Sequence, residues 1–578
     1  MNALNKALSW RAAPLIPPLL LAVCLYFWAV DVLNWDEWLI WTDVLRKLQA
    51  GSLGPADIIL QNNEQRSAIV RVLGLAFFPW FRLARWPELA CTFLMAAGCV
   101  LLAWRLLLRS GWSAADRRPL ALFSALGFSL LQWETFSVGI NTSVLLPVLS
   151  IWAGACLATG GARLSAQRIA LMALVGLPAS FSFANGLFYW PCLAPLIALR
   201  RMEAAPAARS RAALTTGLWL CFGALVWAAY FHGYVKPGHH PSILRALEAP
   251  HMLVGYVLTY LGGALAGDRT LQPLALLAGA FALGALGVLK LALWRTRRND
   301  GGKTLRTLAP WLCVACFSLL TAGATAAARG GFGLGQAQES RYASFSSPLW
   351  MILCALWFLL ETRLNAGARR WLSRGFVLCA ALFAVSTVLA AVVLHNRAPR
   401  LELARQELYR LTQPQNLREV FPDPAFVIAN MPLFLEQRAG IYRRLPPAED
   451  YAPGTRTPGA FTAASNTLLS GRVPGFLLRG TAPGNAGAPL LVLAAGKARA
   501  MGLIGPDERF ELFVPENALP AGRQTLEAFV LAADGRTLRP LGPEDGLSLN
   551  NPGRQVSRFE LNTRFFVPGL TQAGAEGL

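Results

Sequence analysis

Two adjacent acids, Asp36 and Glu37, follow the first long apolar stretch of this 578-residue chain. One interpretation is structural: acids at the start of a helix favour its dipole, beside tryptophans at a membrane surface. The other is chemical. A carboxylate can act as the base for a poor nucleophile such as a sugar hydroxyl, or hold a divalent cation (Mg²⁺ or Mn²⁺) against a phosphate.

A second polar group, the sequence NNEQR at 62–66, comes directly before another apolar stretch. Its arginine, Arg66, is suited to a phosphate oxygen. Glu64 is suited to assist a base or to hold a cation, and Asn63 to bind substrate. The alternative is a solvated loop end whose arginine extends to water.

Three further stretches carry candidate substrate-binding residues between apolar segments. LLQWETFSVGINTS contains Gln132 and places Glu134 at membrane depth, where an acid indicates function unless it reaches interfacial water. SFSFANGLFYWP makes a tight turn at Asn185, which a plain turn also explains. RGGFGLGQAQESRYASFS is a glycine-rich loop able to close over a site, and it ends with Arg341 and Tyr342. It lacks the strand–loop–helix context of a nucleotide-binding motif.

The composition predicts that these residues are positioned by membrane-spanning helices. Hydrophobic residues make up 54% of the chain, charged residues only 15%, and the mean hydropathy is +0.42. About 20 apolar residues span a bilayer. Eleven spans are predicted: 13–33, 86–108, 119–133, 141–159, 169–183, 186–199, 214–232, 270–294, 307–327, 346–361 and 375–394. The shorter apolar stretches 67–81 and 251–266 are expected to be re-entrant or interfacial helices.

The basic residues predict the orientation of these spans. Eighteen arginines and lysines against three acids lie in five loops, 109–118, 160–168, 200–213, 295–306 and 362–374. Such loops face the cytoplasm, so we expect a multi-pass protein of the bacterial inner membrane with a periplasmic C-terminus. This distribution also accounts for much of the net charge of +21. A nucleic-acid partner is therefore not expected.

The chain changes character after residue 394. Residues 402–411 predict an amphipathic helix, and short apolar stretches separated by Gly, Pro and Asp-Gly from about 470 predict an antiparallel β-sandwich with a hairpin at AADGRT. The expected domains are a transmembrane domain over 1–395, a connecting region over 396–470 and a periplasmic β-rich domain over 471–578. All ten cysteines lie before residue 380, in or beside apolar runs, without a disulfide or zinc pattern.

Together, NNEQR, QWETF and SRYASFS resemble motifs of bacterial membrane glycosyltransferases of the GT-C type. More distantly, they are similar to protein mannosyltransferases, lipid A aminoarabinose transferases and arabinosyltransferases. The resemblance covers about residues 13–395. It implies a catalytic acid in the first outer loop, which would be Asp36, and a polyprenyl-phosphate sugar as donor. Asn62 and Gln65 stand where this group usually has histidines. The chain therefore acts through Asp36 and Glu64 alone, has altered specificity, or has lost activity.

The resulting hypothesis is an inverting transferase that moves a sugar from a polyprenyl phosphate to a periplasmic glycan, lipid or protein. Asp36 and Glu64 are the expected catalytic residues. If a metal is used, these two residues are its expected ligands. The expected substrate-binding residues are Glu37, Asn63, Arg66, Gln132, Glu134, Asn185, Arg341 and Tyr342. Two alternatives are a transporter or flippase of a lipid-linked saccharide and a non-catalytic partner in envelope polysaccharide assembly.

Overall fold

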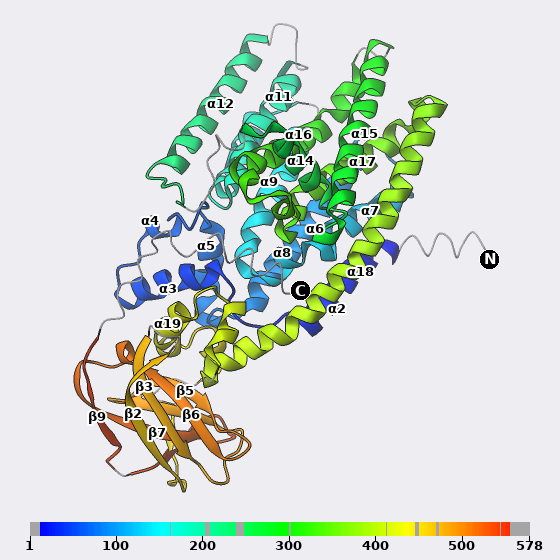
Figure 1. Cartoon of the computed structure of the whole chain (residues 1–578). Coiled ribbons are helices and arrows are strands. Elements are labelled where there is room, and N and C mark those ends of the chain that lie inside the picture. Colours follow the sequence, from blue (N-terminus) through cyan, green and yellow to red (C-terminus); the bar gives the residue numbers. More distant parts are fainter. Residues whose placement is uncertain are drawn as a thin grey trace. The chain divides into compact units, whose positions relative to one another are not determined.

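The computed structural model describes residues 12–161, 163–202, 209–238, 248–299, 302–411, 413–445, 450–469, 473–543 and 545–554. It is 67% helical, with a β-rich region near the C-terminus (Figure 1). The chain forms two compact units. The first contains Met1–Ala29, Ile58–Val72 and Glu88–His395, and the second contains Val30–Asp57, Leu73–Pro87 and Asn396–Leu578.

Helices make up nearly all of the first unit and part of the second. The α-helices are α2 (Ile16–Trp28), α3 (Asp36–Gln49), α4 (Pro55–Ile58), α5 (Ala68–Phe81), α6 (Arg85–Arg109), α7 (Arg118–Gly127), α8 (Trp133–Ser137), α9 (Thr142–Ala158), α10 (Ala166–Ser180), α11 (Tyr189–Met202), α12 (Arg209–Phe231), α14 (Pro250–Gly262), α15 (Gln272–Asn299), α16 (Lys303–Arg329), α17 (Ser340–Leu360), α18 (Ala366–Arg410) and α19 (Pro424–Glu436). Short 3₁₀ helices are η1 (Ala13–Leu15), η2 (Leu130–Gln132), η3 (Gly139–Asn141), η4 (Ala184–Phe188), η6 (Arg269–Leu271), η7 (Gly330–Phe332), η8 (Leu334–Gln338), η9 (Glu361–Arg363), η10 (Pro414–Glu419), η11 (Gly440–Arg444) and η13 (Glu516–Ala518).

Seven helical segments among the described residues are long and apolar enough to cross a membrane: Arg85–Arg109, Gly139–Ala158, Arg209–Phe231, Arg269–Arg295, Lys303–Phe332, Ser340–Arg363 and Ala366–Tyr409. Each overlaps one of the eleven predicted spans. The other four predicted spans fall on α2, α7, α10 and α11, which have 13, 10, 15 and 14 residues. The apolar helices therefore indicate a membrane protein, but the count of eleven is not confirmed by helix length.

The helical unit has central and peripheral helices. Most residues of α9 and α17 are buried, whereas few residues of α12 and α18 are buried. Aromatic side chains fill the centre: the rings of Trp152 on α9 and Trp311 on α16 meet edge to face at 5.7 Å. Large exposed apolar side chains on α12 and α18 are the surface that a bilayer would cover.

The helical unit has two chemically different ends. At one end, Arg109, the last residue of α6, donates a hydrogen bond to the carbonyl of Cys156 near the end of α9 (2.6 Å), and Arg200 on α11 donates to the carbonyl of Ala158 (3.3 Å). Trp311, near the start of α16, donates to Ser110 at the same end (3.0 Å). The opposite ends of α9 and α16 lie at Thr142 and Arg329. Candidate site residues gather there.

The second unit joins distant parts of the sequence. Trp38 on α3 packs against Phe434 on α19, with ring centroids 4.8 Å apart, and Arg46 on α3 donates a hydrogen bond to Asn430 on α19. The helix that begins at Asp36, α3, thus buries apolar side chains in this unit. Residues 402–410 of the predicted amphipathic helix continue the long helix α18, which ends at Arg410.

The β-rich region consists of β1 (Ala452–Pro453), β2 (Ala460–Leu469), β3 (Val473–Thr481), β4 (Pro489–Ala494), β5 (Lys497–Leu503), β6 (Arg509–Pro515), β7 (Gly522–Leu531), β8 (Thr537–Leu541) and β9 (Leu547–Asn551). In the described residues one sheet has the order β1-β8-β7-β4-β5, with β9 also paired to β7, and the other has the order β2-β3-β6. All pairings are antiparallel except β1 with β8. Apolar side chains from both sheets form one buried cluster.

The predicted turn at AADGRT joins β7 to β8 as an antiparallel hairpin. The Asp534 carboxylate accepts hydrogen bonds from the backbone amides of Arg536 and Thr537, both at 2.9 Å. Hydrogen bonds from the Thr537 hydroxyl and these amides lower the pKa of Asp534 to about 2, because they favour the charged form. Residues 555–578, the end of the predicted β-domain, lie outside the described residues.

Candidate functional site

The NNEQR sequence forms a tight turn in the helical unit. Asn62 and Gln65 exchange two backbone hydrogen bonds, of 2.7 and 2.9 Å, so that Asn63 and Glu64 are at the tip. Asn63 has a φ of 53°, a left-handed conformation that asparagine tolerates better than most residues. The local sequence thus presents the Glu64 side chain at the tip of a defined turn.

Glu64 forms an ion pair with Arg329, the last residue of α16. Their side chains are 16% and 15% exposed, so the pair is largely removed from solvent. Water therefore screens the attraction between the two charges less than it would at an exposed site. Arg329 is a site residue that the sequence prediction missed, although it begins the glycine-rich stretch RGGFGLG.

Arg66 is buried and fixes the turn in place. Its guanidinium donates three hydrogen bonds of 2.7 Å, to the backbone carbonyls of Ile59, Tyr230 and His232. The predicted role of Arg66, phosphate binding, stays a prediction. In this arrangement the guanidinium holds the main chain, so other arginines are better placed to bind an anionic ligand.

A second acid–arginine pair joins the WETF and SRY stretches. The Glu134 carboxylate lies 3.9 Å from the guanidinium of Arg341, and it accepts a hydrogen bond from the backbone amide of Arg341 (3.3 Å). Ser340 connects the same two segments: its hydroxyl donates to Leu131 (2.8 Å) and accepts from the amide of Glu134 (3.0 Å). The Arg341 side chain is 30% exposed, so an anion can reach its guanidinium.

Hydrogen bonds connect the turn at 62–66 with the WETF segment. The Gln65 side chain accepts from the amide of Ala184 (2.7 Å), directly before Asn185. The hydroxyl of Ser182 donates to Ser143 (2.9 Å). Asn141, two residues before Ser143, donates to the carbonyl of Glu134 (3.1 Å). The sequence-predicted residues of the helical unit are thus brought together at one end of its helices.

Gln132 and Asn185 are buried parts of this arrangement. The Gln132 amide donates to the carbonyl of Leu126 (2.7 Å), which indicates a structural role for that side chain. Asn185 is 9% exposed in the 3₁₀ helix η4, beside the contact of Gln65 with Ala184.

Tyrosines add hydroxyl groups to the same end of the unit. Tyr342 follows Arg341, and its ring stacks on that of Tyr260 from α14, with centroids 5.2 Å apart. The hydroxyls of Tyr342 and Tyr256 are buried and have no hydrogen-bond partner in the part of the chain that the structure describes. Tyr256 and Tyr260 are four residues apart in an apolar helix, a spacing that places both on one face and that could have been recognised in the sequence.

Asp36 and Glu37 lie at the first turn of α3, in the second unit, and their environments differ. Asp36 is half-buried, whereas Glu37 is 1% exposed. The Glu37 carboxylate accepts the backbone amide of Asn34 (2.6 Å) and lies 3.7 Å from the guanidinium of Arg85. The contacts of Glu37 are those of a buried structural acid. Asp36 is therefore the better candidate for chemistry.

The described ranges contain no preformed cluster of side chains that could bind a metal ion. No group of three or more His, Cys, Asp or Glu side chains there is placed to hold a metal ion. Histidine is a common metal ligand, and four of the five histidines lie between residues 232 and 251. Two of these, His239 and His240, lie outside the described residues. Arginines are the cationic groups that accompany Glu64 and Glu134.

Comparison with protein-family models, curated proteins and solved structures finds no match for this chain.

Proposed function

We propose that this protein is a GT-C-type glycosyltransferase, which moves a sugar from a polyprenyl-phosphate donor to a glycan, lipid or protein acceptor. The observation that carries the proposal is the pairing of Glu64 with Arg329 and of Glu134 with Arg341, at the helix ends opposite the arginine-rich loops. A lipid phosphate is held at the membrane surface, so arginines at helix ends are positioned to meet it.

In the proposed reaction the acceptor hydroxyl oxygen forms a bond to the anomeric carbon of the sugar. The bond from that carbon to the phosphate oxygen breaks, and polyprenyl phosphate leaves with the electron pair. The hydroxyl proton passes to a carboxylate base. The assignment of this base to Asp36 rests on the sequence resemblance, whereas Glu64 is paired with Arg329.

Arg329 and Arg341 would stabilise the charge that develops on the leaving phosphate. When the phosphate binds Arg329 and Arg341, it replaces the carboxylates of Glu64 and Glu134 as their partner. These carboxylates can then accept hydrogen bonds from sugar hydroxyls. The buried hydroxyls of Tyr256 and Tyr342 support a polyhydroxyl ligand, because buried polar groups favour a hydrogen-bond partner. Since two arginines supply positive charge, the reaction in this form needs no divalent cation, which a chelator would test.

We further propose eleven membrane spans, a periplasmic C-terminus in a bacterial inner membrane, and a β-sandwich formed by the two C-terminal sheets. The arginine-rich loops support the orientation. The cluster of apolar side chains shared by both sheets supports the sandwich, since two sheets bury their inner faces against each other in that architecture.

The test is sugar transfer by the purified full-length protein in liposomes, with a panel of polyprenyl-phosphate sugars as donors. Arg341→Gln should lower turnover by about 10²-fold or more, the typical loss of a group that stabilises developing charge. Arg269→Gln is the matched control, since Arg269 pairs with Glu339 nearby but is 73% exposed. Its effect should be less than about twofold, because exposed pairs contribute little.

Transfer that is unchanged in Arg341→Gln would remove this arginine from the mechanism. If no donor in the panel supports transfer, while the protein moves a lipid-linked saccharide across the bilayer, the transporter hypothesis replaces the enzyme. If the protein does neither, a non-catalytic assembly role is favoured.

A further inference from the structure

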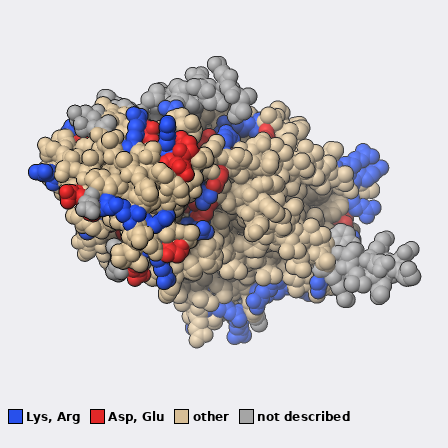
Figure 2. Space-filling model, turned by 90° about the horizontal axis from the view of Figure 1, so that it is seen from below, with Lys and Arg blue, Asp and Glu red and all other residues tan. Residues whose placement is uncertain are grey.

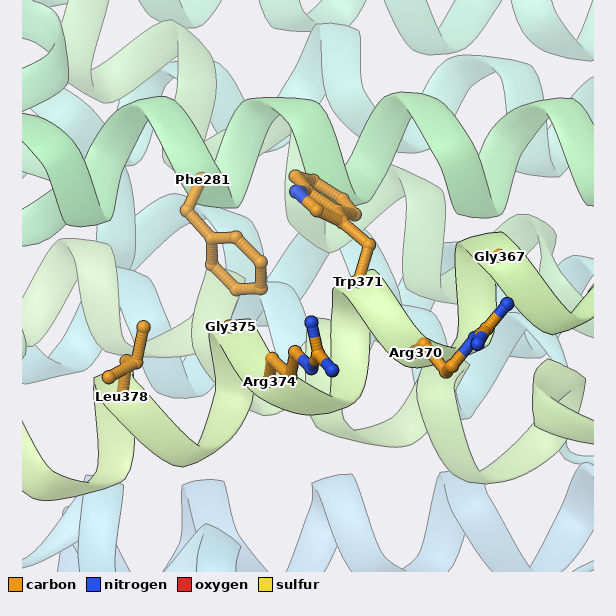
Figure 3. A pocket seen from close by; sticks show the side chains of 7 residues that line it. All are labelled: Phe281, Gly367, Arg370, Trp371, Arg374, Gly375 and Leu378. Carbon is orange, nitrogen blue, oxygen red and sulfur yellow. The ribbon is translucent and has the colours of Figure 1, made fainter.

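A groove of about 490 Å³ lies between α15 and the first turns of α18, within the helical unit (Figure 3). Phe281 from α15 lines it, together with Gly367, Arg370, Trp371, Arg374, Gly375 and Leu378 from α18. In Figure 3 the rings of Phe281 and Trp371 point into the space between the two helices. The groove is separate from the residues of the candidate site.

Glycines shape this groove. A Cβ atom on Gly375 would come within 2.0 Å of the Phe281 ring, so this ring packs directly on the backbone of α18. Two turns earlier, a Cβ atom on Gly367 would have the Asn365 side-chain oxygen as its neighbour, at 3.6 Å. The missing side chain at Gly367 therefore leaves the end of the groove open.

The groove combines positive charge with exposed apolar surface. Arg370 and Arg374 are four residues apart, so they share a face of α18, and both are exposed. Neither pairs with a carboxylate in the described ranges, and the Arg370 guanidinium donates a hydrogen bond to the carbonyl of Ala366 (3.3 Å). Trp371 is 46% exposed and Leu378, one turn beyond Arg374, is 70% exposed. Along α18, the exposed surface therefore changes from basic at Arg370 and Arg374 to apolar at Leu378.

We propose that this groove binds one anionic phospholipid. Its phosphate lies between Arg370 and Arg374, and an acyl chain follows Trp371, Phe281 and Leu378 toward the middle of the membrane. Arginine binds phosphate through charge-assisted hydrogen bonds, and tryptophan is typical of the headgroup level of a membrane. Basic pockets between membrane helices are suited to anionic headgroups. This inference does not depend on the proposed transferase activity.

The experiment is native mass spectrometry of the purified full-length protein, titrated with phosphatidylglycerol or phosphatidylcholine. Wild-type protein should retain one phosphatidylglycerol with at least about tenfold higher affinity than phosphatidylcholine. Arg370→Gln with Arg374→Gln should lower phosphatidylglycerol affinity about tenfold or more, since each basic residue near an anionic lipid contributes roughly 1 kcal/mol. Arg295→Gln with Arg369→Gln is the control: it removes the same charge from exposed arginines outside the groove, and it should leave affinity unchanged.

Gly367→Leu tests the shape of the groove without changing its charge. The Cβ of this leucine has no backbone clash; the substitution should preserve the helix and lower phosphatidylglycerol affinity by occupying the groove. Equal affinity of the wild type for both lipids would overturn the proposal. So would an equal loss in the two double variants, because that result assigns binding to general surface charge. Full retention in Gly367→Leu would also overturn it.

Discussion

At the residue scale, the two adjacent acids at the start of α3 serve different purposes. Glu37 is enclosed, and its carboxylate holds the amide of Asn34 beside the buried guanidinium of Arg85. Asp36 remains half-exposed one position earlier. Adjacent residues do not share a helix face, so a single step along the chain separates a structural acid from a candidate catalytic one.

Glu37→Gln should therefore reduce stability. Glutamine keeps the size of the side chain and an oxygen for Asn34, but it removes the negative charge opposite Arg85. Loss of one partner of a buried ion pair costs about 3–5 kcal/mol, and the retained hydrogen bond places the expected cost near the lower value. Thermal unfolding of the purified protein should show a midpoint several degrees lower. A midpoint equal to that of the wild type would contradict a structural role for Glu37.

Asp36→Asn should leave stability nearly unchanged and should reduce sugar transfer. The thermal midpoint should change little, because an acid in the first turn of a helix contributes only about 0.3–1 kcal/mol. Sugar transfer should fall by at least about 10²-fold if Asp36 is the general base. Both quantities are measured on the same purified variant. Unchanged transfer in an active preparation would exclude Asp36 as the base.

The candidate site could be predicted from sequence only in part. Glu64, Glu134 and Arg341 stand out as polar residues beside apolar runs, and the structure pairs both acids with arginines. The partner of Glu64, Arg329, is 265 positions away, and no local pattern gives that pairing. Burial separates Glu37 from Asp36, and burial depends on Arg85 and other distant residues that a local sequence pattern does not include.

At the element scale, close packing of α14 on α15 depends on two reciprocal glycines. A Cβ on Gly262 of α14 would lie 1.8 Å from the Ala275 carbonyl oxygen of α15. A Cβ on Gly279 of α15 would lie 1.9 Å from the Leu258 carbonyl oxygen of α14. Small residues allow such backbone contact between helices in membranes. This packing holds Tyr256 and Tyr260 in the candidate site.

Gly279→Ala should separate these helices and lower stability by about 1–3 kcal/mol, the typical cost of inserting a methyl group into packed structure. Gly287→Ala, on the same helix, is the matched control, because nothing lies within 4 Å of its added Cβ. Alanine is the better helix former, so the control should be neutral or stabilising. The measurement is thermal unfolding in one detergent. Similar unfolding midpoints for the two variants would show that the close contact at Gly279 does not contribute to stability.

Hydropathy located the long helices but could not determine the length of the shorter ones. Apolar residues at 119–133 predict one span, yet α7 ends at Gly127 and the Ser129 hydroxyl caps the following 3₁₀ helix, η2. The apolar run then continues through a bend instead of a straight helix. Likewise, α10 stops at Ser180, two residues after Pro178. Capping and backbone geometry, which a hydropathy average does not record, decide these ends.

At the scale of the whole molecule, the distribution of charge is more informative than its sum. Figure 2 shows basic and acidic side chains next to one another on part of the visible face, and broad areas with neither elsewhere. The net charge of the whole chain is +21, and on this face the basic side chains are not gathered into a single patch. The arginines that matter for orientation lie in loops at one end of the helical unit, where they indicate the cytoplasmic side.

The number of spans can be tested through the loop 109–118. If α2 crosses the membrane, this loop follows two spans and lies on the same side as the N-terminus; if α2 does not cross, it follows α6 alone and lies on the opposite side. The apolar helix Ala13–Trp28 is roughly 24 Å long at about 1.5 Å per residue, a little short of a bilayer core of about 30 Å. Residues 29–33 are not helical, and at about 3.3 Å per residue extended chain there covers the remainder.

We therefore expect α2 to cross and the loop 109–118 to be cytoplasmic, in agreement with Arg109, Arg117 and Arg118 in it. A fluorescent reporter that matures only in the cytoplasm should be active when fused after Ser113 and after Arg211. A phosphatase active only in the periplasm should report when fused after Leu578. A reporter fused to the N-terminus should be active as well; inactivity there together with activity after Ser113 would mean that α2 does not cross. Asp36 is separated from Ser113 by the long apolar helix Arg85–Arg109, so a periplasmic Ser113 would place Asp36 on the cytoplasmic side, where it could not act on a donor presented at the periplasmic surface.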